Sequence, residues 1–489
     1  MTDPHLPSAP YAYASVDEMV DALATNRWTS YEIVEKLIER VRALDAPETT
    51  TQLHAMAALS DDALDQATRL DDERRAGTLR SSLHGVPIVI KDNIEAAGLP
   101  GAAGSTSLRG RPANDAPLVT RLRDAGLVVL GSTNLSEWAN LRSPRSTSGW
   151  SATGGLVANP WALDRSAGGS SSGSGAALAA GYAPLAIGTE TDGSIVCPSS
   201  VNGVVGLKPT VGVVSRVGVV PISASQDSPG PMGRSVRDVA ALYDILSGGA
   251  VSLGATEPLH FAFATTWNTN HPATDEALRQ LVEALRRAGH EVIDREVAIP
   301  TSEVLTDEMS VMVAELYDDL GAYLEGRPGE GVRSVADVVA FENAHADIEL
   351  PFFGHEFLDM AIASGGRAGE LYQAARANSL RWAVDECLTP GLDGVDAILA
   401  PSYGPAWKSD LIVGGHYGVA ASCATTPPAI AGWPIMNVPV DLVGGLPVGA
   451  ALVGRAGAEA TLLRAALAVE ASSAWDSSWR ATFQAPSRG

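Results

Sequence analysis

The sequence predicts a layered α/β fold that forms one large domain over residues 1–489. From about residue 83, short apolar runs alternate with Gly-rich turns and helical stretches, as they do in layered α/β proteins. Strand-like runs return after residue 395 as additions to the same sheet. Neither an internal repeat nor a long linker separates independent units, so we expect a single domain.

Residues 1–75 are predicted to form an N-terminal helical part. Ser15 with Glu18, and Thr29 with Glu32, have the spacing of a capping box at a helix start. Apolar residues then recur at helical spacing, at positions 16, 19, 20 and 23 and again at 33, 34, 37, 38 and 41. We expect these apolar faces to belong to the core.

Residues 83–240 are predicted to carry the functional site. Strand patterns over residues 86–90 and 127–130 flank a helical pattern over residues 118–125. Residues 149–233 are dense in Gly and Ser and poor in long helical patterns. A loop-rich region of that size inside a compact protein is usually a functional site.

The remaining chain divides into two further parts. Residues 254–390 are more helical and more acidic, as in the pattern over residues 274–288, and we expect a peripheral helical section that shapes a substrate funnel. Residues 395–489 hold strand patterns at 396–400, 435–440 and 446–453 and are predicted to complete the core with strands and a helix.

Composition excludes several classes of protein. The chain has 34 Lys and Arg against 57 Asp and Glu, a net charge of −23, which argues against nucleic acid or an anionic membrane as a partner. Cys197, Cys387 and Cys423 are too few and too scattered for a disulfide framework or a zinc site, and we expect no metal. No apolar run reaches ~18 residues without a charge or a Gly or Pro, and no secretory signal is visible. We expect a cytoplasmic protein, with a secreted mature form left open.

Lysine is scarce, occurring only at positions 36, 91, 208 and 408. A buried lysine can lose its proton near neutral pH, whereas arginine cannot. Lys91 ends an apolar strand pattern, where desolvation lowers the pKa of an amine. A lysine at the end of a strand is more often a surface group. Because the chain contains so few lysines, however, Lys91 is a candidate for a catalytic role. Lys36 is predicted to be a solvated surface charge.

The Gly/Ser-rich run over residues 168–175 admits several interpretations. A phosphate-binding loop needs Lys after its last Gly, and a dinucleotide fingerprint needs a third Gly that Leu178 replaces, so both are unfavourable. A nucleophile elbow centred on Ser171 matches, and would predict an α/β-hydrolase. A flexible linker is the remaining interpretation, although linkers do not interrupt a sheet pattern.

A second run, over residues 186–198, places Ser194 in a tight glycine turn directly after a strand pattern. Main-chain N–H groups in such a turn can point at one spot and form an oxyanion hole. The alternative is an ordinary turn at the end of a strand.

Together these motifs resemble the amidase signature family. The resemblance rests on residues 91–93, 131–134, 168–173, 190–195, 203–210 and 229–232, in that order, and it covers most of the chain. It implies a mixed central β-sheet covered by helices on both faces, with residues 83–240 as the catalytic core. It also implies an amide hydrolase that needs neither metal nor cofactor.

The resemblance assigns roles to individual residues. It makes Ser194 the nucleophile, Ser170 a bridging serine that follows a cis peptide bond from Gly169, and Lys91 the base of an acyl-enzyme mechanism. The oxyanion hole would consist of the main-chain N–H groups of Thr191, Asp192, Gly193 and Ser194. Ser171 is expected to orient this network, and Asn93 to line the pocket.

Three positions need comment. Asp192 stands where many relatives have Gly, and a carboxylate there would oppose an oxyanion if it pointed inward, so we expect it to point away or to bind substrate. Ser132 stands where many relatives have Lys. Cys197 is a rival nucleophile, but without a positioned histidine we expect it to be a packed small residue.

Residues 136–140, 148–151, 192–198 and 226–231 are most similar to bacterial peptide amidases. This similarity implies a peptide amide or amino-acid amide as substrate, ammonia as product, and a monomer or homodimer. Two alternatives within the family are the glutamine-hydrolysing component of a tRNA-dependent amidotransferase and a general aliphatic or aryl amidase. An α/β-hydrolase centred on Ser171 and a non-catalytic binding protein also stay open.

Overall fold

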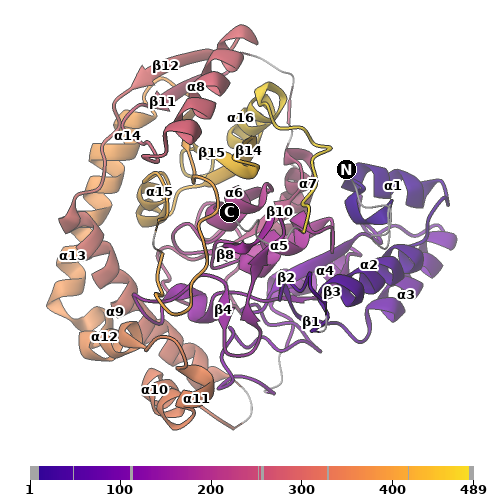
Figure 1. The fold of residues 1–489 in the computed structure, drawn as a ribbon, viewed down its shortest axis with the longest axis horizontal. Helices are drawn as coiled ribbons and strands as arrows, with labels where there is room; N and C mark the ends of the chain where they lie inside the picture. Colours follow the sequence, from indigo (N-terminus) through magenta and orange to yellow (C-terminus); the bar gives the residue numbers. More distant parts are fainter. Residues whose placement is uncertain are drawn as a thin grey trace.

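The computed structural model describes residues 10–483, except residues 48, 111–113, 250, 252, 255–257, 328–329 and 417. Its centre is an 11-stranded sheet that crosses the whole molecule (Figure 1). In order across the sheet, the strands are β1 (Met56–Leu59), β3 (Val128–Thr133), β2 (Pro87–Lys91), β8 (Leu185–Glu190), β10 (Ser228–Gly233), β9 (Val205–Lys208), β14 (Ile435–Val443), β15 (Leu446–Val453), β13 (Ala397–Pro401), β11 (His260–Ala264) and β12 (Glu291–Arg295).

The sheet is mixed, as predicted. β2 runs parallel to β3 and β8, and β11 runs parallel to β12 and β13, whereas the other pairs are antiparallel. Two small two-stranded sheets lie beside it, formed by β4 (Trp150–Ser151) with β5 (Gly155–Leu156) and by β6 (Ala158–Asn159) with β7 (Ala162–Ser166).

Helices cover both faces of the sheet, which confirms the predicted layered class. The helices are α1 (Val16–Ala24), α2 (Ser30–Leu44), α3 (Ala63–Arg75), α4 (Pro117–Asp124), α5 (Ser172–Ala179), α6 (Val196–Asn202), α7 (Val236–Ser247), α8 (Pro272–Arg287), α9 (Ser302–Gly326), α10 (Val335–Ala344), α11 (Ala346–Glu349), α12 (Glu356–Ser364), α13 (Glu370–Arg381), α14 (Thr389–Gly391), α15 (Thr426–Ala431) and α16 (Glu459–Ser472). Side chains on a strand alternate between faces, and β15 shows this directly. Ala450 and Leu452 pack in one core cluster with α7, α8 and α16, whereas Ala451 and Val453 pack in another with α6 and α15.

Several predicted elements are confirmed. Ser15 and Glu18 form a capping box at the start of α1, and Thr29 and Glu32 form one at the start of α2. The strand predicted over residues 446–453 coincides with β15, and the patterns at 86–90, 118–125 and 127–130 become β2, α4 and β3.

Other strands were not predicted. Residues 254–390 were expected to be a helical section, and the helix predicted over residues 274–288 is present as α8. It lies between β11 and β12, however, which form one end of the sheet, and the mainly helical stretch starts only at α9. β10 has the sequence Ser-Pro-Gly-Pro-Met-Gly, whose Pro and Gly residues disfavour a strand. It is nevertheless paired along its whole length with β8, because the surrounding sheet overrides local propensity.

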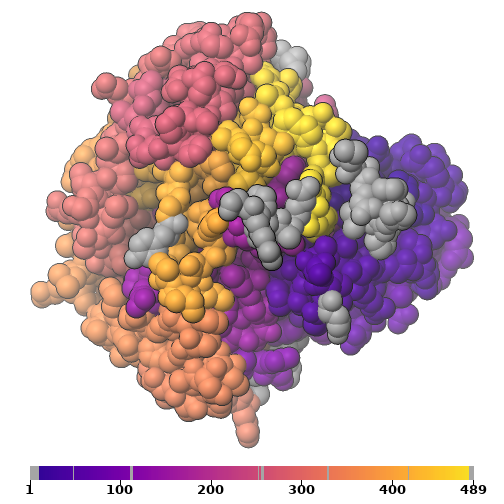
Figure 2. All heavy atoms as spheres, in the orientation of Figure 1, coloured from indigo at the N-terminus to yellow at the C-terminus, as the bar shows by residue number. Residues whose placement is uncertain are grey.

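Helix α9 connects the peripheral helices to the centre of the molecule. It packs against α12 and α13 on the side of Figure 1 away from the N-terminal helices. Leu316 and Leu320 of α9 also share a core cluster with Trp138 and Leu141. In Figure 2 the magenta central segment is largely covered by its indigo, orange and yellow neighbours. Within the described residues, no helix combines the length and apolarity needed to span a bilayer.

Truncation of Leu452 tests the two-faced core. Leu452 of β15 is fully buried, so Leu452→Ala should lower the free energy of unfolding by about 2–5 kcal/mol through lost contacts and a residual cavity. The matched control is Leu371→Ala, because Leu371 is 83% exposed and its truncation should change the value by less than about 0.5 kcal/mol. Urea denaturation followed by tryptophan fluorescence measures both, and equal midpoints for the two variants would contradict the described core.

Candidate active site

Lys91 lies at the end of β2 with its side chain fully buried. Its Nζ lies 2.8 Å from Ser170 Oγ, 2.9 Å from Thr189 Oγ1 and 3.2 Å from the Thr189 carbonyl oxygen. Burial lowers the pKa of Lys91 from 10.5 to about 7, although the charges of Asp227 and Glu190 oppose this shift. The amine is therefore neutral in a large fraction of molecules near pH 7 and contacts a serine hydroxyl.

The Gly169–Ser170 peptide bond is cis, as the family resemblance implies. A Cβ at Gly169 would overlap Ser136 Oγ, so any larger residue here would force the Ser136 side chain to move. The main-chain carbonyl of Ser170 accepts a hydrogen bond from the Ser136 N–H at 3.1 Å. The loop before α5 thus holds the buried Ser170 against Lys91.

Ser171 joins this loop to the turn that carries Ser194. Its main-chain N–H donates to the carbonyl oxygen of Ser194 at 3.1 Å, which places the two serine segments side by side. The Ser171 hydroxyl donates to the Thr189 carbonyl at 3.1 Å and accepts from the Thr189 N–H at 3.2 Å. Because both of these bonds tie it to the end of β8, Ser171 fastens the two segments together.

The turn over residues 191–194 leaves β8 and leads into α6. Gly193 has a φ of 76°, which glycine adopts without strain. The buried Glu190 carboxylate accepts hydrogen bonds from the N–H groups of Ile195 (2.7 Å) and Val196 (2.9 Å) and so fixes the start of α6. Among the described hydrogen bonds, none is donated by the N–H groups of Asp192, Gly193 or Ser194. These three donors remain available to a ligand.

Ser194 is 7% exposed and lines a cavity of about 400 Å³. The lining combines apolar and polar side chains. The lining consists of Ala139, Asn140, Leu141, Ser148, Gly169, Thr191, Asp192, Ser194, Cys197, Ile222, Met309, Met312, Phe357, Tyr403, Trp407, His416, Val419 and Ala421.

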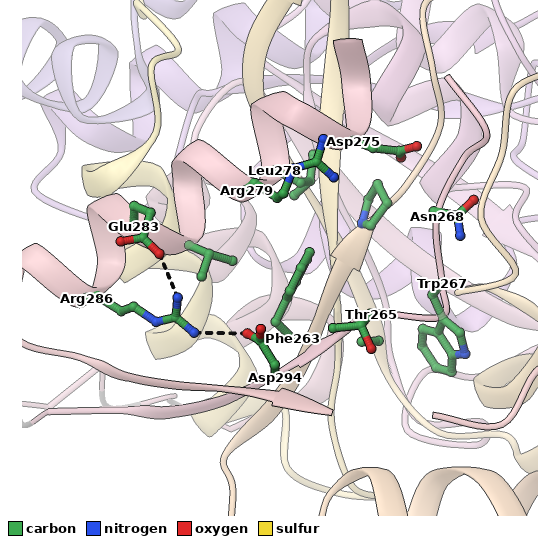
Figure 3. A pocket seen from close by; sticks show the side chains of 13 residues that line it. Phe263, Thr265, Trp267, Asn268, Asp275, Leu278, Arg279, Glu283, Arg286 and Asp294 are labelled. Atoms are coloured by element: carbon green, nitrogen blue, oxygen red, sulfur yellow. Dashed lines mark hydrogen bonds and ion pairs between the residues drawn. The ribbon is translucent and has the colours of Figure 1, made fainter. Parts of the chain in front are cut away.

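A second cavity of similar volume lies between α8 and the strands β11 and β12 (Figure 3). The ion pairs of Arg286 with Glu283 and Asp294 lie along its lining. None of the residues predicted to act in chemistry lines this cavity, whereas Ser194 lines the first. The first cavity is therefore the candidate active site.

The remaining predicted site residues lie close to this centre. Asn93 Nδ2 donates to Thr189 Oγ1 at 3.0 Å, the same oxygen that Lys91 contacts. Asn93 lines a smaller neighbouring cavity. Asp192 accepts from Thr426 Oγ1 at 2.9 Å, and its carboxyl group also hydrogen bonds that of Glu308. Cys197 is buried beside Ala406 and Trp407, and burial raises the pKa of its thiol to about 12. A thiol in that state is a poor nucleophile.

Three further residues belong to this centre, although no role was predicted for them. Thr189 contacts Lys91, Asn93 and Ser171, and nothing in the sequence distinguishes it from other strand threonines. Glu190 holds the turn. Lys208 is fully buried and donates to the Trp433 carbonyl at 2.7 Å, and burial lowers its pKa to about 8. The scarcity of lysine could have drawn attention to Lys208 as it did to Lys91.

The structure thus brings together a buried amine, a serine that follows a cis peptide bond and a second serine on a turn with unpaired N–H donors among the described residues. The family described as Amidase matches residues 32–463. The chain belongs to the amidase signature family and is a hydrolase of linear amide C–N bonds.

Individual relatives cover nearly the whole chain. A probable amidase of Arabidopsis thaliana is 35% identical, over 94% of this chain and 89% of its own length. A glutamyl-tRNA(Gln) amidotransferase component from Symbiobacterium thermophilum is 34% identical, over 90% and 93%. The native peptide amidase of Stenotrophomonas maltophilia is similar in structure, with a TM-score of 0.88, 39% identity and coverage of 95% and 98%. Peptide amidase PAM with the competitive inhibitor chymostatin gives a TM-score of 0.88, 40% identity and coverage of 94% and 98%.

Proposed function

We propose that the chain hydrolyses the C-terminal amide of peptides, or the amide of amino-acid amides, and releases ammonia. The observation that carries the proposal is the buried Lys91 amine, 2.8 Å from Ser170 Oγ and beside the turn of Ser194. The similarity to two peptide amidase structures at 39–40% identity supports the choice of substrate.

The proposed reaction begins with proton transfer along the two serines. Neutral Lys91 accepts the proton of Ser170, and Ser170 accepts the proton of Ser194, while Ser194 Oγ forms a bond to the amide carbon. The N–H groups of Thr191, Asp192, Gly193 and Ser194 stabilise the oxyanion that develops. One well-placed donor of this kind contributes about 3–4 kcal/mol to transition-state stabilisation.

The second half of the reaction returns the protons. The C–N bond breaks as the relay delivers a proton to the leaving nitrogen, which departs as ammonia and leaves an ester on Ser194. Water then attacks the ester carbon while the same relay takes one of its protons. The bond between this carbon and Ser194 Oγ breaks, the relay returns the proton to Ser194 Oγ, and the free acid is released. Every step uses side chains and main-chain groups of this protein, which is why we expect no metal or cofactor.

The cavity gives the substrate an apolar surface. Met309 and Met312 from α9 and Phe357 from α12 line it, together with Ile222 and Trp407. We therefore assign the helical section to the wall of the substrate funnel and expect an apolar side chain on the residue that carries the amide.

Glutamine hydrolysis for an amidotransferase remains the second candidate, because a relative with an amidotransferase name is 34% identical over most of the chain. It predicts little activity in the absence of a partner protein.

A substrate panel tests the proposal. The purified chain alone should hydrolyse dipeptide amides with an apolar C-terminal residue, with a larger kcat/KM than for glutamine, acetamide or benzamide. Ammonia release, measured by a coupled assay, reports all of them on one scale. Faster turnover of glutamine or of simple amides than of peptide amides would contradict the proposed substrate class.

Three substitutions test the assigned roles. Ser194→Ala should abolish covalent labelling by a fluorophosphonate, because it removes the attacking oxygen, whereas Ser171→Ala should still be labelled. Lys91→Arg keeps a positive charge but cannot supply a neutral base, so kcat should fall about 10²–10⁴-fold. Intact-protein mass spectrometry and steady-state assays give these results, and labelling that depends on Ser171 would favour the α/β-hydrolase mechanism.

The pH profile tests the base. Lys91 acts only when neutral, and burial lowers its pKa to about 7, so the neutral fraction grows as pH rises through 7. kcat/KM should therefore increase from pH 5 to about pH 8. A profile that peaks below pH 6 would be incompatible with a lysine base.

A further inference from the structure

Two carboxyl groups from distant parts of the chain meet beside the active-site cavity. Asp192 belongs to the turn of Ser194, and Glu308 lies on α9 and is 4% exposed. Their carboxyl groups hydrogen bond each other. Two carboxylates cannot hydrogen bond unless one carries a proton, so the pair holds a proton between its oxygens.

The other hydrogen bonds indicate which oxygens share that proton. Gln226 Nε2 donates to Glu308 Oε1 at 3.0 Å, and Thr426 Oγ1 donates to Asp192 Oδ2 at 2.9 Å. Asp192 Oδ1 is buried and receives no hydrogen bond from an N–H or hydroxyl group of the described residues. The shared proton therefore belongs between Glu308 Oε2 and Asp192 Oδ1.

The surrounding charges indicate which acid stays neutral. Asp192 accepts from Thr426 and is attracted by Lys208, while Glu190, Tyr403 and Cys423 also lie within its electrostatic reach. Burial raises the pKa of Glu308 well above its usual value, and the neighbouring Asp192 raises it further. Glu308 is thus the protonated partner and donates to the Asp192 carboxylate.

We propose that Glu308, as a neutral acid, is a positioning residue that holds Asp192 and through it the oxyanion-binding turn over residues 191–194. This inference rests on the proposed function, because it assumes that the turn stabilises the oxyanion. It gives α9 a second task besides lining the funnel. It also explains how an acidic side chain is tolerated two residues before Ser194, since its oxygens are bound by Thr426 and Glu308.

The shared proton makes the geometry of the turn depend on pH. When Glu308 loses its proton, two buried carboxylates face each other and repel, and the turn is displaced from its productive geometry. A displacement of about 1 Å costs on the order of 100-fold in rate. kcat should therefore decline as pH rises through the pKa of Glu308, which is the opposite direction to the rise caused by Lys91.

Glu308→Gln tests this directly, because its amide can donate to Asp192 but cannot titrate. The variant should lack the decline of kcat with rising pH that loss of the Glu308 proton causes in the wild type. Glu308→Ala removes the donor, and its kcat should fall about 100-fold at pH 7 while KM changes little. Glu303→Gln, an exposed position on the same helix, is the control and should keep the wild-type profile.

The outcomes distinguish this inference from the proposed function. A decline of kcat with rising pH that persists in Glu308→Gln would belong to another group, such as Lys208, and would overturn the inference. Equal kcat for Glu308→Gln and Glu308→Ala would also overturn it. If Glu308→Ala does not fold, the profile of Glu308→Gln decides alone. If Ser194→Ala retains activity, the proposed function itself fails, whatever the Glu308 variants do.

Discussion

The desolvation of one amine is the constraint on which the rest of this site depends. Lys91 ends a strand that is buried along its whole length, so its ammonium form loses its hydration and its pKa falls to about 7. Burial alone is not enough for a base, because the neutral amine must also lie within hydrogen-bonding distance of the group whose proton it accepts. Ser170 Oγ lies 2.8 Å from the amine, and the carbonyl oxygen and Oγ1 of Thr189 also hydrogen bond it. The sheet supplies the burial and the loop before α5 supplies the partner.

The buried charges around this amine form a connected set that shapes the turn of Ser194. Glu190 binds the first N–H groups of α6, Asp227 accepts from Thr191 Oγ1 at 2.6 Å, and Lys208 lies within reach of Glu190 and Asp192. Each buried charge is costly unless it is paired or hydrogen bonded, and each here is. These contacts hold the turn, while the described hydrogen bonds include none donated by the N–H groups of Asp192, Gly193 or Ser194. Fixed donors of this kind are the preorganisation that we propose for amide hydrolysis.

Sequence patterns were sufficient for the elements with strong local signals and for the residues inside motifs. We could predict the capping boxes at Ser15 and Thr29 and the strand β15 from local patterns alone. Lys91, Ser170 and Ser194 could be singled out because each lies inside a recognisable motif. β10 escaped prediction because its Pro and Gly residues oppose strand formation locally and only its pairing with β8 imposes one. A role for Glu308 could not be predicted, because its partner Asp192 is distant in the sequence and the contact forms only when α9 packs against the turn.

The ionisation of Lys91 is the most direct measure of the central claim. The chain has only four lysines, so ¹³Cε-lysine labelling gives a simple NMR spectrum, and Lys91→Arg identifies the signal. We expect the Lys91 signal to titrate with a midpoint near pH 7, well below that of Lys36, whose pKa is raised by its hydrogen bond to Glu39. A Lys91 signal that remains that of an ammonium group up to pH 10 would contradict the account, because no neutral amine would then exist to accept the Ser170 proton.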